Sequence, residues 1–128
     1  MRNKFLGTGD PGYHPWRKLA TVVSGLRYAV IYDFSVAWKL IASIPVLVAT
    51  LLLRDWLDSL LLLVVTVFVL VAEMFNSAIE ALCDFVEPRY SEKIAVIKDI
   101  AAAAVGLAML AWLLVLGFEV EAMLAGAG

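Results

Sequence analysis

Three long apolar segments, separated by short polar stretches, dominate the chain. The first covers residues 35–53 and is almost wholly apolar apart from Lys39 and Pro45. The second covers residues 57–85 and the third covers residues 94–118. Because about 20 apolar residues in a helix cross the hydrocarbon layer of a bilayer, the pattern predicts three membrane-spanning helices. A proline is tolerated inside such a helix, so Pro45 does not end the first one.

The segment before these spans, residues 16–32, has a different pattern. Its apolar residues recur at helical spacing and are accompanied by Arg17, Lys18 and Arg27. This combination is typical of a helix in the membrane interface, with basic side chains such as Lys18 and Arg27 facing lipid head groups. The alternative is a leading turn of the first spanning helix. Residues 1–14, which are polar and broken by glycine and proline, are expected to be a flexible tail.

Composition supports a membrane protein of a single domain. The chain has 128 residues, of which 63% are hydrophobic, and a soluble fold of this length cannot bury so many apolar side chains. The net charge of −2 gives no support for nucleic acid as a partner, which normally needs a basic patch. The expected fold is therefore an all-α membrane protein with three transmembrane helices and an amphipathic interfacial helix at the N-terminus.

The basic residues indicate how the helices are oriented. They gather before the first span and between the second and third spans, at Arg2, Lys4, Arg17, Lys18, Arg27, Arg89 and Lys93. The positive-inside rule then places the N-terminus and the loop over residues 86–93 in the cytoplasm. Trp56 and Trp112 are expected at the outer interface, where an indole can be half hydrated.

A polar stripe runs along the cytoplasmic half of the second span. At about 100° per residue, all its members fall within an arc of about 100° of one helix; they are Glu73, Asn76, Ser77, Glu80 and Asp84. Counting about 20 residues inward from Leu57 places Glu73 just below the head groups and Glu80 among them or beyond. The same counting on the other spans brings Asp33, Lys98 and Asp99 to this level.

Two interpretations of these polar groups compete. Asp33, Lys98 and Asp99, taken singly, are well explained as solvated helix ends, and Asn76 and Ser77 as helix-packing contacts. Two carboxylates on one face are explained poorly in this way, because an ionisable group inside the hydrocarbon edge costs about 2.5–3.5 kcal/mol. We therefore favour a functional site.

The residue types point to phosphoryl transfer. Carboxylates without histidine or cysteine clusters are hard oxygen ligands, which suit Mg²⁺. Lys98 beside Asp99 supplies a positive charge for phosphate, and a carboxylate at the depth of a lipid hydroxyl can act as a general base. No Walker sequence is present, so a nucleotide would be held in another way.

The chain resembles the prokaryotic diacylglycerol kinase family, which includes the undecaprenol kinases. Glu73, Asn76, Ser77 and Glu80 fit the pattern E-x-x-N-S/T-x-x-E, and a K-D pair follows in the third span. Gly25-Leu26-Arg27 and the three-helix layout extend the likeness over residues 16–118. The resemblance implies a homotrimer in the bacterial inner membrane, with active sites between subunits at the cytoplasmic interface.

The resemblance also implies roles for individual residues. Glu73 matches the general base on the lipid hydroxyl. The implied metal ligands are Glu80 and Asp33, the latter standing where the family usually has a glutamate. The implied ATP-binding residues are Asn76, Lys98, Asp99, Arg89 and Tyr90. We assign lipid contacts to Lys18, Arg27 and Ala102.

The function expected from the sequence is ATP- and Mg²⁺-dependent phosphorylation of a membrane lipid alcohol. Diacylglycerol is the preferred acceptor and undecaprenol the alternative. A different class, a non-catalytic helical scaffold or a small ion-conducting oligomer, remains open. A channel should be lined with polar groups along its whole length, whereas these groups gather at one depth.

Overall fold

The computed structural model describes residues 14–126, and the chain folds there into four helices in sequence. Their bounds are α1 Pro15–Tyr32, α2 Phe34–Leu53, α3 Trp56–Val86 and α4 Glu92–Leu124. No strand occurs among these residues. The tail expected over residues 1–14 lies, except for His14, outside the described residues, as do Arg2 and Lys4.

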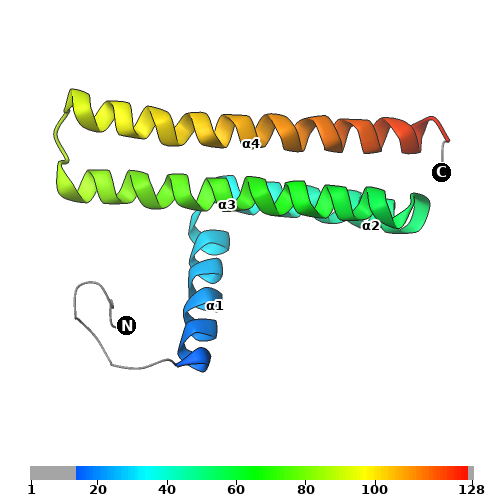
Figure 1. Ribbon diagram of the computed structural model, residues 1–128, viewed down its shortest axis with the longest axis horizontal. Coiled ribbons are helices and arrows are strands. Elements are labelled where there is room, and N and C mark those ends of the chain that lie inside the picture. The colour runs from blue at the N-terminus through cyan, green and yellow to red at the C-terminus, as the bar shows by residue number, and fades with distance from the viewer. Residues whose placement is uncertain (1–13, 127–128) are drawn as a thin grey trace.

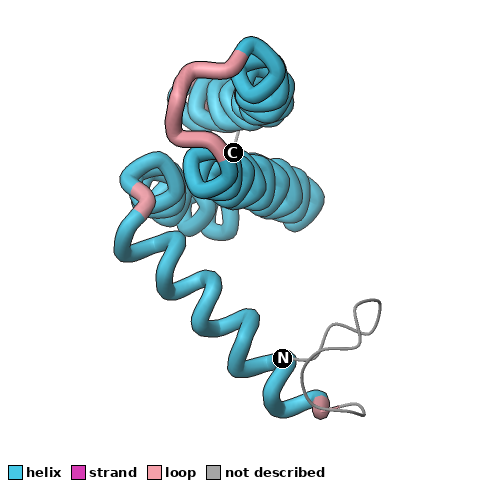
Figure 2. Tube along the Cα trace, turned by 90° about the vertical axis from the view of Figure 1, so that its left-hand side faces the viewer, coloured by secondary structure: helices cyan, strands magenta, loops and turns pink. Residues whose placement is uncertain are grey.

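Three of the helices, α2, α3 and α4, run side by side as a bundle, whereas α1 points away from it (Figure 1). The longest packing interface joins α3 to α4, and α2 packs mainly on α3. In a view along the bundle, α1 joins the N-terminal end of α2 and extends away on the opposite side of α3 from α4 (Figure 2). The three bundle helices are each long and apolar enough to cross a membrane.

Local chemistry explains where the helices begin and end. Pro15 opens α1, where its missing N–H costs nothing and its fixed φ suits a helix. Asp33, with an extended backbone, ends α1 and caps α2, because its Oδ1 accepts the Ser35 N–H at 3.0 Å. Only this residue separates the two helices, so the chain turns sharply there. Pro88 follows the end of α3 and prevents its continuation.

The buried core is small and lies between α3 and α4. It consists of Leu62, Val65, Val69 and Trp112, with Trp38 of α2 packed against it. The rings of Trp38 and Trp112 meet edge to face with centroids 5.8 Å apart. Outside this core, most apolar side chains on the bundle are exposed, which suits helices surrounded by lipid.

Two expectations at the far end of the bundle were wrong. Trp112 is 1% exposed rather than half hydrated, because its side of α4 faces α3 and a large apolar ring fills that contact. The third span, expected over residues 94–118, is longer than that, since α4 continues to Leu124. Glu119 is fully buried there and pairs with Arg54, with 3.1 Å between Nε and Oε2.

Candidate functional site

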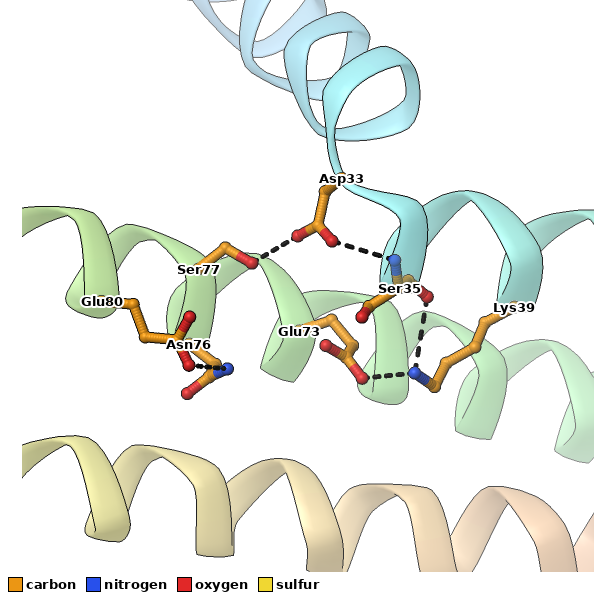
Figure 3. A network of polar contacts seen from close by, with 7 residues as sticks. All are labelled: Asp33, Ser35, Lys39, Glu73, Asn76, Ser77 and Glu80. Carbon is orange, nitrogen blue, oxygen red and sulfur yellow. Dashed lines mark hydrogen bonds and ion pairs between the residues drawn. The ribbon is translucent and has the colours of Figure 1, made fainter.

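The junction between α1 and α2 brings Asp33 against the polar stripe of α3. Its Oδ2 accepts a hydrogen bond from the Ser77 hydroxyl, while Oδ1 caps α2 (Figure 3). An open groove of about 560 Å³ lies beside this contact and is lined by residues from α1, the junction and α3, including Tyr28, Tyr32 and Ala78. The sequence placed Asp33 and Ser77 at one depth, and the structure brings them into direct contact.

Glu73 lies deeper in the bundle, where it forms an ion pair with Lys39 of α2 (Figure 3). The side chains are 7% and 3% exposed, respectively. The Lys39 ammonium also donates to the Ser35 carbonyl at 3.4 Å and lies 4.7 Å from the centre of the Trp38 ring. Lys39 contacts Oε1 of Glu73, whereas Oε2 has no hydrogen-bond partner among residues 14–126 and is not fully enclosed.

Asn76 and Glu80 form the part of the stripe nearer to water. Asn76 Nδ2 donates to Glu80 Oε1 at 3.2 Å, and Asn76 Oδ1 is buried without a partner in the described chain. An unpartnered amide oxygen beside a carboxylate suits a hard cation such as Mg²⁺. Asp33, the other candidate ligand, contacts Ser77 rather than Glu80. No cluster of three or more acidic, histidine or cysteine side chains among the described residues is arranged to hold a metal. Two carboxylates can nevertheless suffice, because Mg²⁺ commonly takes its remaining ligands from water and substrate phosphates.

Three of the five candidate nucleotide ligands lie in or near the connection between α3 and α4. Lys98 of α4 pairs with Asp84 of α3 at 2.6 Å, and Arg89 pairs with Glu87 at 3.0 Å. Hydrogen bonds from the Arg89 side chain and backbone lower the pKa of Glu87 below its ordinary value. Tyr90 is 86% exposed. Lys98, Arg89 and Tyr90 all line one small pocket of about 140 Å³.

Other predicted site residues are not gathered in this single chain. Asp99 is exposed on α4, and its side chain makes no hydrogen bond or ion pair with another described residue. Lys18 and Arg27 lie on α1, and Arg27 lines a groove along that helix. Ala102 is exposed on α4, across α3 from α1 (Figure 1). The structure therefore does not bring the three candidate lipid contacts together.

The sequence interpretation missed Lys39 as a site residue. A lysine inside an apolar span is costly and usually has a partner in the bundle, so its position alone was a signal. The pair between Arg54 and Glu119 was missed as well, because both residues stand at the edges of apolar segments and resemble ordinary solvated ends.

Comparison with known proteins adds an independent finding. A search of curated proteins found no match for the chain. The family model described as prokaryotic diacylglycerol kinase matches residues 20–119, which include the whole of α2 and α3, most of α1 and α4, and the polar stripe. This match covers most of the sequence and agrees with the likeness carried by Glu73, Asn76, Ser77 and Glu80. The chain therefore belongs to the prokaryotic diacylglycerol kinase family.

Proposed function

We propose that the protein transfers the γ-phosphoryl group of ATP to a membrane lipid alcohol, with Mg²⁺ as the required metal ion. Diacylglycerol, which would become phosphatidic acid, is the acceptor we favour, and undecaprenol is the alternative. Membership of the family supports a lipid kinase. The observation that carries the proposal is Glu73, a buried carboxylate in a spanning helix whose Oε2 is open to a donor.

Glu73 is the general base in this mechanism. The lipid hydroxyl donates to Oε2, its O–H bond breaks, and its oxygen forms a bond to the γ-phosphorus. The bond from that phosphorus to the bridging oxygen breaks, and ADP leaves. A positioned base of this kind contributes about 10²–10⁴-fold to a rate. The pair between Lys39 and Oε1 leaves the second oxygen of Glu73 for this proton.

The remaining candidates bind and orient the nucleotide. Lys98 and Arg89 bring positive charge to the phosphates, and Asn76, Asp99 and Tyr90 complete the contacts proposed for ATP. When bound, Mg²⁺ neutralises charge on the transferring phosphoryl group. Glu80 and Asp33 are the residues that would hold it, with support from the unpartnered Oδ1 of Asn76.

We further propose that the working site is shared between subunits of a homotrimer. Ligand pockets of small molecules usually measure about 300–1,000 Å³. The pocket at Lys98, Arg89 and Tyr90 measures about 140 Å³, too little for a nucleotide. A neighbouring subunit would enlarge this pocket and supply the lipid contacts that one chain keeps apart.

The proposed setting is the bacterial inner membrane, with the N-terminus and the loop between α3 and α4 in the cytoplasm, where ATP is present. The distribution of basic residues supports this orientation. In this orientation α1 lies on the cytoplasmic membrane surface, with Lys18 and Arg27 at the lipid head groups.

A direct assay tests the proposal. Purified protein in mixed micelles is given Mg²⁺ and ATP radiolabelled at the γ-phosphate, with dioleoylglycerol or undecaprenol as acceptor, and labelled lipid is measured. We expect phosphorylation that needs Mg²⁺ and that Glu73→Gln lowers at least about a hundredfold in kcat. The matched control is Glu121→Gln, at an exposed position near the C-terminal end of α4, far from Lys98. This variant should keep wild-type activity.

The alternative class gives the opposite result. A scaffold or channel would phosphorylate neither lipid, and Glu73→Gln would then disturb assembly rather than turnover. Absence of labelled product with both lipids in folded wild-type protein would overturn the proposed kinase function. The ratio of kcat/KM for the two lipids decides between diacylglycerol and undecaprenol.

A further inference from the structure

Lys39 is a charged residue in an apolar environment, where an ammonium group is costly to bury. It lies within α2, a helix apolar enough to span a membrane, and its side chain is 3% exposed. Its ammonium has three neighbours, which are the Glu73 carboxylate, the Ser35 carbonyl and the Trp38 ring. All three surround the one nitrogen, so the cation is held in a defined place.

The contact is asymmetric at the carboxylate. Lys39 contacts Oε1 of Glu73, while Oε2 is left without a partner in the part of the chain that the structure describes. An ammonium on one oxygen fixes the rotation of the carboxylate and so the direction of the other oxygen.

We propose that Lys39 is a positioning residue for Glu73. It fixes the rotation of the carboxylate through Oε1 and so aims Oε2 at the hydroxyl of the lipid alcohol. Lys39 itself neither gains nor loses a proton, because the hydroxyl proton passes to Oε2. This role rests on the proposed kinase function, in which Glu73 is the base.

A kinetic comparison of two substitutions tests the role. Lys39→Gln keeps a hydrogen-bond donor but removes the charge, and should lower kcat by about 10- to 100-fold with the KM for ATP within about twofold of wild type. Lys39→Arg keeps the charge in a different shape and should recover most of the loss, leaving kcat about two- to tenfold below wild type. The matched control is Lys93→Met, at an exposed lysine in the first turn of α4.

Non-additivity separates positioning from a general structural effect. In a Glu73→Gln background, Lys39→Gln should lower the residual kcat by less than about twofold, because the base it positions is already gone. A structural defect would lower the residual activity as much as it lowers that of the wild type. If Lys39→Gln does not fold, Lys39→Arg is compared in the wild-type and Glu73→Gln backgrounds, and an equal fractional loss of kcat in both overturns the role.

The outcomes separate the two proposals. Folded wild-type protein that phosphorylates neither lipid contradicts the kinase function. An active wild type with an equally active Lys39→Gln variant contradicts only the role of Lys39.

Discussion

The bundle contains two buried ion pairs, one toward each end, and they differ in what they leave open. At the end near α1, Lys39 covers one oxygen of Glu73, and the second oxygen is not fully enclosed. At the opposite end, Arg54 binds Oε2 of Glu119, whose side chain is 0% exposed. Oε1 of Glu119 is fully buried and has no hydrogen-bond partner within residues 14–126.

The difference concerns access rather than charge. Both carboxylates are on spanning helices and each has a cation, although Arg54 also pairs with Asp58, with 3.4 Å between Nη2 and Oδ1. Glu119 is buried and joins α4 to the turn between α2 and α3, which gives it a structural role. Glu73 keeps an oxygen to which no described residue donates a hydrogen bond, and the proposed function assigns this oxygen to the lipid hydroxyl. The predictions below test whether this contrast holds.

The largest contrast should appear in turnover. We expect Glu73→Gln to lower kcat by about 10²–10⁴-fold, because an amide cannot take up the hydroxyl proton. Glu119→Gln should leave kcat within about threefold of wild type, because that residue touches no reacting group. Both are measured in the lipid phosphorylation assay with saturating ATP. Comparable losses in the two variants would show that burial, rather than access, governs the effect.

The pair of Arg54 with Glu119 should matter more for the free energy of unfolding than for turnover. Arg54→Met removes the cation from a fully buried carboxylate, and we expect the free energy of unfolding to fall by about 3–5 kcal/mol. Equilibrium unfolding of the micelle-bound protein in increasing sodium dodecyl sulfate measures it. The double variant Arg54→Met/Glu119→Leu should recover most of the loss, since no fully buried charge is then left unpaired; Asp58, the second partner of Arg54, has a side chain that is 22% exposed. A double variant as unstable as Arg54→Met would contradict this account.

A smaller effect is expected at the junction of α1 and α2. Ser77→Ala removes the hydroxyl that donates to Asp33, and we expect a loss of about 1.5 kcal/mol in the free energy of unfolding. The same unfolding measurement applies. Ser35→Ala is the matched control, because the cap contact comes from its backbone N–H and persists. Equal losses in both variants would show that the hydroxyl of Ser77 contributes nothing specific.

The smallest effect should be confined to the loop after α3. Hydrogen bonds from Arg89 lower the pKa of Glu87, so their stabilising contribution is present above the ordinary pKa of a glutamate and is lost as the pH falls through the lowered pKa. Arg89→Gln should raise the pKa of Glu87 toward its ordinary range, as followed by an NMR titration of that side chain. Exposed pairs contribute little, so no change in global unfolding is expected. An unchanged titration of Glu87 would contradict the pairing.

The helices were largely predictable from the sequence because apolar length is a strong signal in lipid. The spans expected over residues 35–53 and 57–85 match α2 and α3 to within one residue at every end. The last span was placed too short, because the apolar run ends at Phe118 and is followed by a charged residue, Glu119. A charge that finds a buried partner from a distant turn, here Arg54, can continue a helix that composition alone would end.

The candidate site was predictable in depth but not in pairing. Helical spacing placed Glu73, Asn76 and Ser77 on one face, and the structure does join Ser77 to Asp33. Spacing within one helix cannot say which side chain of another helix faces it, so the pair of Glu73 with Lys39 was missed. The position of Trp112 was missed for the same reason, since its burial depends on the face that α3 presents.

Only Asp33 separates α1 from α2, so the direction of α1 and the position of the Asp33 carboxylate cannot change independently. The junction has no further residues that could accommodate an insertion, and one extra residue in a helix rotates everything before it by about 100°. An alanine inserted on either side of Asp33 would therefore turn α1 to another direction relative to the bundle or swing the carboxylate away from Ser77. Chain length at this junction is fixed as tightly as the identity of any side chain in the bundle.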